Sequence, residues 1–102
     1  MKLYLDDSRN CPEGYILFRP EDLDEFYSLA ASKSCEIISF DHDLGDNFPT
    51  GYDILVRLEK MVYDGMLWEG GAPILMVHSS NPVGSERMGK AIASIYRMVG
   101  VR

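Results

Sequence analysis

The amino-acid sequence predicts a small α/β domain built on a mostly parallel sheet of about four strands. Two observations lead to this prediction. Four short apolar runs have the length and composition of buried strands, and segments with helical periodicity lie between the later ones. Strands that alternate with helices indicate a parallel sheet with right-handed crossovers. The predicted order is strand, strand, helix, strand, helix, strand, helix.

The chain has 102 residues and is predicted to form one domain over residues 1–102. A chain of this length buries about 60–65% of its unfolded surface, which is enough for a stable core without disulfides or a structural metal. With 46% hydrophobic and 25% charged residues, its composition is that of a soluble globular protein. The two cysteines, Cys11 and Cys35, match no metal-finger spacing, so we expect unpaired thiols in a reducing compartment.

Nothing in the sequence favours a membrane or a secreted location. No apolar run approaches the ~18 residues needed to cross a bilayer, and the N-terminus begins with a strand instead of a signal peptide. We therefore expect a cytoplasmic protein. The net charge of −6 and the lack of a Lys/Arg cluster argue against extended nucleic-acid binding. A small phosphorylated ligand or a nucleotide end is the expected partner, and the sequence leaves the oligomeric state open.

The predicted strands cover residues 1–5, 15–18, 37–40 and 73–77. The last of them is an unbroken apolar run, which is typical of a strand covered on both faces. The first helix is expected over about residues 21–32, where apolar side chains recur at helical spacing after Pro20.

Two further helices are indicated by their start signals. Thr50 suits the cap of a helix in a unit that ends at Gly70-Gly71. Asn81 followed by Pro82 has the signature of a cap and a first helical residue, and this final helix carries an apolar stripe.

Polar clusters follow three of the four predicted strands. They are Asp6-Asp7, Asp41-His42-Asp43 and His78-Ser79-Ser80-Asn81. In open α/β sheets, ligands bind at the carboxyl ends of the strands, so these clusters predict one active or ion-binding site.

The acids Asp6, Asp7, Asp41 and Asp43 are candidate metal ligands. Two carboxylates ~4 Å apart repel by roughly 4 kcal/mol at an effective dielectric of 20, and either proton uptake or a bound cation relieves that repulsion. We favour the cation, and oxygen ligands favour Mg²⁺ or Mn²⁺ over zinc. Taken alone, Asp6-Asp7 would also fit an Asx turn that leaves the strand.

His42 and His78 are candidates for proton transfer near neutral pH. Alternation along an extended chain places Asp41 and Asp43 on one side and His42 on the other. His42 is equally compatible with a metal ligand or with a hydrogen bond to a loop carbonyl.

Four residues are candidates for holding a phosphate group. Ser79 and Asn81 lead into a helix N-terminus, whose free N–H groups attract anions. Arg9 can add a fork-shaped clamp, and Thr50 opens the middle helix beside the acidic loop. A simple cap for Thr50 or Asn81, and an exposed loop position for Arg9, are the alternatives.

With these residues in place, the chain resembles a receiver-type domain, the phosphoacceptor fold of two-component signalling. The resemblance implies a small receiver-like (flavodoxin-like) three-layer sandwich. Two departures weigh against a standard phosphorelay switch: residues 6–14 are too short for the usual helix, and no fifth strand ending in lysine follows the last helix. The similarity rests on Asp6-Asp7, Asp41, Pro49-Thr50-Gly51 and Ser79.

The chain resembles the cyclic-phosphate processing receiver domain family more closely. The shared motifs span nearly the whole chain in order: Leu5-Asp6-Asp7-x-Arg9 with Pro12, Ser39-Phe40-Asp41-His42-Asp43-Leu44-Gly45, Thr50-Gly51-Tyr52-Asp53, and His78-Ser79-x-Asn81-Pro82-x-Gly84 with Met88. This resemblance implies a metal-supported phosphoesterase that acts on cyclic or terminal phosphates of nucleotides or RNA ends.

The leading hypothesis is a hydrolase of cyclic phosphate esters, with Asp41, His42 and His78 as its catalytic residues. In a variant that the receiver resemblance suggests, Asp41 is a covalent nucleophile. Three alternatives stay open: a non-catalytic module that binds a phosphate ligand or a partner protein, a phosphoacceptor signalling receiver, and a structural domain with a stabilising cation.

Overall fold

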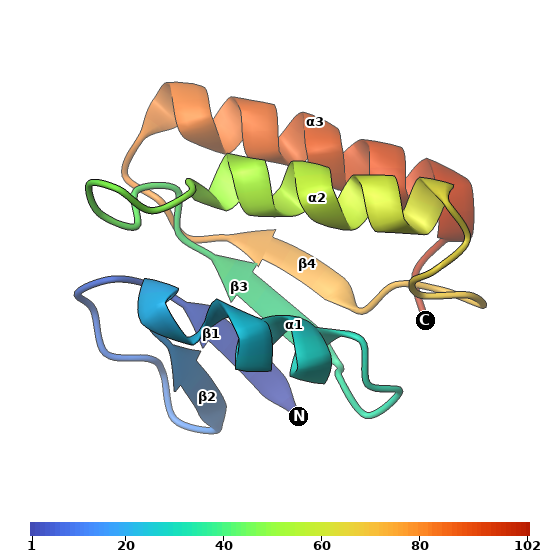
Figure 1. The fold of residues 1–102 in the computed structure, drawn as a ribbon, viewed down its shortest axis with the longest axis horizontal. Coiled ribbons are helices and arrows are strands. Elements are labelled where there is room, and N and C mark those ends of the chain that lie inside the picture. Colours follow the sequence, from blue (N-terminus) through green and yellow to red (C-terminus); the bar gives the residue numbers. More distant parts are fainter.

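The computed structural model describes residues 1–102 and contains one four-stranded sheet and three α-helices (Figure 1). The element order is the one that the sequence predicts. The strands are β1 (Lys2–Leu5), β2 (Tyr15–Phe18), β3 (Ile37–Phe40) and β4 (Ile74–Val77). The helices are α1 (Leu23–Ala30), which a short 3₁₀ turn precedes, α2 (Gly51–Tyr63) and α3 (Pro82–Val99).

All neighbouring strands are parallel, and their order in the sheet is β2-β1-β3-β4. The carboxyl ends of all four strands therefore lie at one edge of the sheet. The two central strands, β1 and β3, are in register, with Leu5 beside Phe40. Consequently the residues that follow them, Asp6 and Asp41, emerge next to each other.

All three helices contribute to a single core on one face of the sheet. Phe26 of α1, Leu58 of α2 and Ile95 of α3 belong to the same buried cluster as Leu5 and Phe40. The crossovers from β2 to β3 and from β3 to β4 run in the same direction across the sheet, and right-handed crossovers then place both helices on the same face. The connection that runs the other way, from β1 to β2, contains no helix.

The α/β class with four parallel strands is thus confirmed, but the layering differs from the three-layer arrangement that the resemblance implies. The structure has two layers, because the second face of the sheet has no helix over it (Figure 1). On this face of β4, Ile74 and Met76 are each 47% exposed. The prediction that β4 is covered on both faces is therefore wrong.

The helix starts predicted at Thr50 and Asn81 are confirmed, whereas the first helix begins at Leu23, after a 3₁₀ turn over Pro20–Asp22, and not at residue 21. Thr50 and Asp53 form a capping box, in which Asp53 N donates to Thr50 Oγ1 (3.1 Å) and Thr50 N donates to Asp53 Oδ2 (2.9 Å). Asn81 Oδ1 accepts a hydrogen bond from Gly84 N at the start of α3 (2.9 Å). No helix in the structure has the length and apolar character of a membrane span. Neither cysteine is in a disulfide.

Candidate functional site

An acidic cluster lies at the carboxyl ends of the two central strands. One oxygen from each of Asp6, Asp7 and Asp41 lies within 4.8 Å of the others. Asp6 is fully buried and Asp41 is 7% exposed, whereas Asp7 is open to solvent. The strand pairing fixes this proximity, since Asp41 N donates to Leu5 O (2.9 Å) directly beside Asp6.

Asp6 is the most firmly held member of the cluster. Its Oδ1 accepts hydrogen bonds from Ser8 N (2.9 Å) and Arg9 N (2.8 Å), and its Oδ2 lies 3.0 Å from His78 Nε2. Burial opposes ionisation of Asp6, but these hydrogen bonds outweigh it and lower the pKa of the carboxyl group. Asp6 is therefore charged at neutral pH in the folded protein.

The pKa of Asp41 is shifted in the opposite direction to that of Asp6. Burial, together with the nearby charge of Asp6, raises the pKa of Asp41 above its usual value. Its one hydrogen bond comes from His42 N, which donates to Oδ1 (2.8 Å). A buried carboxylate with one donor beside a second carboxylate is a group that a bound cation would stabilise.

His78 connects β4 to this cluster. Besides its contact with Asp6, the ring has Nδ1 at 2.7 Å from Ser39 Oγ and stacks on Tyr4 with 3.9 Å between ring centroids. Burial lowers the pKa of His78 in spite of the neighbouring Asp6 carboxylate. Both ring nitrogens thus have partners within the protein, and the backbone carbonyl of His78 accepts a hydrogen bond from Arg9 Nη1 (2.8 Å).

A second polar group lies between the end of β3 and the start of α3. His42 Nδ1 lies 2.9 Å from Asp43 Oδ1, and Asn81 Nδ2 approaches both side chains at 3.4 and 3.5 Å. The imidazole packs on the first turn of α3, where a Cβ atom on Gly84 would lie 2.4 Å from His42 Cδ2. Hydrogen bonding from His42 lowers the pKa of Asp43.

The structure places Asp43 away from the expected metal set. Its exposed carboxylate faces His42 and Asn81, whereas the cluster of possible metal ligands contains Asp6, Asp7 and Asp41. Strand alternation does not extend to Asp43, because β3 ends at Phe40. Beyond it, the chain turns toward α2, and Gly51 N donates to His42 O (2.8 Å).

The remaining predicted residues surround the two groups. Ser79 Oγ accepts a hydrogen bond from Asn81 N (3.1 Å), and Arg9 is anchored on His78. Thr50 is engaged in its capping box at the start of α2. A Cβ atom on Gly51 would lie 1.9 Å from the carbonyl oxygen of Asp41, so this glycine lets α2 begin directly against the end of β3.

The family model for the cyclic-phosphate processing receiver domain matches residues 1–94. The chain belongs to this family. No curated protein and no solved structure is significantly similar to it. The match covers all four strands and most of α3. It therefore includes every residue of the acidic cluster and of the second polar group, which contains His42, Asp43 and Asn81.

Two residues near the acidic cluster of this receiver domain are missed by the sequence analysis. Ser39 and Tyr4 are paired across β3 and β1 and face the same side as His78. Ser39 is the one polar residue within the apolar strand β3, and this is the feature of the sequence that could have identified it as a site residue. Its significance depends on the register between β3 and β4, which brings His78 beside it.

The acidic cluster of the receiver domain suits a hard divalent cation. Its three possible ligands are all carboxylates, and Mg²⁺ and Mn²⁺ prefer oxygen donors. The single hydrogen bond on Asp41 leaves that carboxylate available as a ligand, and Asp7 is open to solvent. The residues therefore fit Mg²⁺ or Mn²⁺.

Proposed function

We propose that this domain is a metal-supported phosphoesterase that hydrolyses cyclic or terminal phosphates of nucleotides or RNA ends. The observation that carries the proposal is the acidic cluster of Asp6, Asp7 and Asp41 at the carboxyl edge of a parallel sheet. Arg9, anchored at the rim of this cluster, supplies the positive charge that a phosphate ester needs. Family membership supports the phosphate chemistry.

Asp6, Asp7 and Asp41 would hold the divalent cation. When bound, such an ion polarises a phosphoryl oxygen and acidifies a water molecule. Arg9, Ser79 and Asn81 would orient the phosphate, and Thr50 would contribute by fixing the N-terminus of α2. In the covalent variant, Asp41 would attack the phosphorus through the oxygen that has no hydrogen-bond donor, and the ester P–O bond would break as the leaving oxygen takes up a proton. Water would then hydrolyse the aspartyl phosphate and free Asp41.

The two histidines suit different tasks. His78 is engaged at both ring nitrogens, so its role is to hold Asp6 in place. His42 contacts Asp43 through Nδ1, and its Nε2 has no partner in the protein. A carboxylate on Nδ1 favours the tautomer in which Nε2 accepts a proton, which makes His42 the better proton-transfer group.

The test is incubation with nucleoside 2′,3′-cyclic phosphates and Mg²⁺ or Mn²⁺, followed by ³¹P NMR. We expect hydrolysis that Asp41→Asn abolishes and that the matched control Asp46→Asn, at an exposed loop position, retains. Tight ligand binding without product would instead identify a binding module. An acid-labile adduct on Asp41 after treatment with acetyl phosphate would identify a signalling receiver. Metal-dependent melting with no ligand binding would leave only a structural cation.

A further inference from the structure

The charge of the chain is distributed unevenly. Helix α3 contains three basic residues and one acidic residue, Glu86, and so carries a net charge of +2. The rest of the chain has seven basic and fifteen acidic residues, a net charge of −8. The positive potential of the protein is therefore concentrated along α3, and an anion would be attracted to this helix more than to the rest of the surface.

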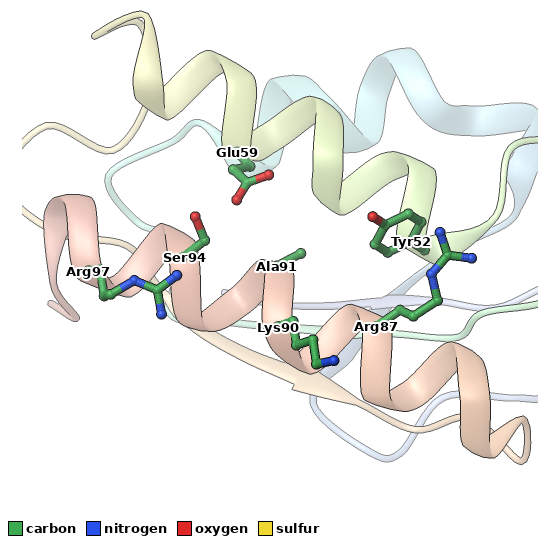
Figure 2. A pocket seen from close by; sticks show the side chains of 7 residues that line it. All are labelled: Tyr52, Glu59, Arg87, Lys90, Ala91, Ser94 and Arg97. Atoms are coloured by element: carbon green, nitrogen blue, oxygen red, sulfur yellow. The ribbon is translucent and has the colours of Figure 1, made fainter.

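The basic side chains of α3 line a groove of about 430 Å³ between α2 and α3 (Figure 2). Arg87, Lys90 and Arg97 come from α3, while Tyr52 and Glu59 come from α2. Arg87 and Arg97 are ten residues apart, which corresponds to about 15 Å along a helix. The groove thus presents three cations and one carboxylate along its length.

Two of these cations have no acidic partner. Lys90 pairs with Glu86 at 3.6 Å, but neither Arg87 nor Arg97 forms an ion pair. The Arg87 guanidinium instead lies 4.2 Å from the centre of the Tyr52 ring. An arginine stacked on tyrosine offers both charge and a flat surface, the combination that proteins use to bind single-stranded nucleic acids.

One end of the groove adjoins the acidic cluster. Tyr52 directly follows Gly51, whose backbone packs against the carbonyl oxygen of Asp41. Met88, the neighbour of Arg87, also reaches Gly51, since a Cβ there would lie 2.7 Å from Met88 Cε. The groove therefore runs along α3 and away from the edge of the sheet where the phosphate site is proposed.

We infer that this groove binds the backbone of a short single-stranded RNA whose 3′ end lies at the acidic cluster. The inference rests on the proposed function and deepens it, because it makes an RNA end the substrate in preference to a free mononucleotide. A 2′,3′-cyclic phosphate requires a ribose 2′-hydroxyl, which restricts the polymer to RNA. The cations of α3 are too far apart along the chain to be recognised as a cluster in the sequence, and the helix brings them onto one stripe.

The test is fluorescence anisotropy with a short, labelled single-stranded RNA that ends in a 3′-phosphate. Three neutralised phosphates predict a slope of about −2 for log K against log salt concentration. Affinity should therefore fall about 20-fold between 50 and 200 mM salt, and only about threefold in the double variant Arg87→Gln, Arg97→Gln, whose slope should be about −0.7. The control Lys33→Gln, Lys60→Gln changes the net charge equally on exposed residues outside the groove, and it should bind like the wild type.

Equal losses in both double variants, or a slope near zero in the wild type, would overturn the inference. Competition by an acidic peptide as strong as by unlabelled RNA would also overturn it, because the groove would then fit an acidic protein. A hydrolysis assay with mononucleotide cyclic phosphates tests the proposed function separately from RNA binding by the groove. The Arg87→Gln, Arg97→Gln variant should hydrolyse these mononucleotides as the wild type does. If the wild type binds RNA but hydrolyses nothing, the proposed phosphoesterase activity is wrong and the groove is still an RNA-binding site.

Discussion

The Ser39 hydroxyl oxygen lies 2.7 Å from Nδ1 of His78, on the face of the sheet opposite the hydrophobic core. The other ring nitrogen of this histidine lies 3.0 Å from Oδ2 of Asp6. Because an ionised carboxylate can only accept, Nε2 carries the proton, and in the neutral ring Nδ1 accepts the Ser39 proton. Ser39 thus orients the histidine that holds a candidate metal ligand.

Replacing Ser39 by alanine should disturb His78 even in the absence of metal. Loss of a hydrogen-bond partner for a largely buried nitrogen costs about 1–3 kcal/mol of unfolding free energy. We expect this loss in urea denaturation, together with changed ¹⁵N shifts of the His78 ring in NMR spectra. Ser39→Thr should restore the ring shifts, and the exposed control Ser28→Ala should change neither quantity. Unchanged ring shifts in Ser39→Ala would refute this role.

Replacing Asp41 by asparagine should stabilise the metal-free protein. The substitution removes a buried carboxylate whose ionisation is opposed by burial and by Asp6, and we expect a gain of about 1 kcal/mol or more in EDTA. Mg²⁺ at 100 times its dissociation constant should stabilise the wild type by about 2.7 kcal/mol and the variant far less. Thermal melts with and without Mg²⁺ measure both effects. Equal stabilisation of the two proteins by Mg²⁺ would place the cation elsewhere.

The stability difference between Asp41→Asn and the wild type should depend on pH in a direction that the pKa of Asp41 determines. Because the folded-state pKa of Asp41 is raised, its ionisation destabilises the fold as the pH rises from the unfolded value of about 3.9 through the folded value. In EDTA, the stability advantage of Asp41→Asn should therefore grow over this range and then level off. Asp6 has a lowered pKa, so its contribution is present above about pH 3.9 and is lost as the pH falls through the folded value. Denaturation curves at a series of pH values test both signs.

Two glycines in helices should respond oppositely to alanine. Gly51→Ala places a methyl group against the backbone carbonyl of Asp41, and we expect a loss of about 3 kcal/mol. Gly89→Ala enters open space on α3 and should stabilise the protein by about 0.5–1 kcal/mol. Urea denaturation compares the two. A mild effect at Gly51 would mean that α2 can move away from β3 at little cost.

The two histidines can be separated by activity and metal affinity. His42→Gln should lower the rate of phosphoester hydrolysis by about 100-fold or more, the usual contribution of a general acid or base, with Mg²⁺ affinity nearly unchanged. His78→Gln should weaken Mg²⁺ binding by about 10–100-fold, because it frees Asp6 Oδ2 from its only donor. Isothermal titration calorimetry and initial rates give the two quantities. A reversal of these effects would exchange the assigned roles.

Much of the fold and the core of the site follow from local sequence. Short apolar runs marked the strands, and the caps at Thr50 and Asn81 marked two helix starts. The approach of Asp6 to Asp41 follows from the fact that parallel strands share a carboxyl edge. The arrangement in two layers, with all helices on one face of the sheet, could not be predicted from local sequence. The face on which a helix lies depends on the order of the strands in the sheet, and no local pattern encodes that order.

The same limitation explains the site residues that the sequence analysis misplaced or missed. Side chains alternate between the two faces only within a strand. The prediction that Asp43 lies on the same side as Asp41 is wrong because Asp43 lies beyond the end of β3. Ser39 became relevant only through the pairing of β3 with β4. The stripe of Arg87, Lys90 and Arg97 depends on helical geometry and on a neighbouring helix that completes the groove.

The single layer of helices leaves apolar side chains such as Ile74 and Met76 hydrated in the native state. The folded chain nevertheless exposes 5736 Å² in total, close to the roughly 5,800 Å² expected for a folded chain of 11.5 kDa. The exposed face of the sheet therefore does not reduce the total surface that folding removes from water. The heat-capacity change of unfolding should accordingly be ordinary for this length, about 1.2–1.5 kcal/mol/K, and differential scanning calorimetry measures it.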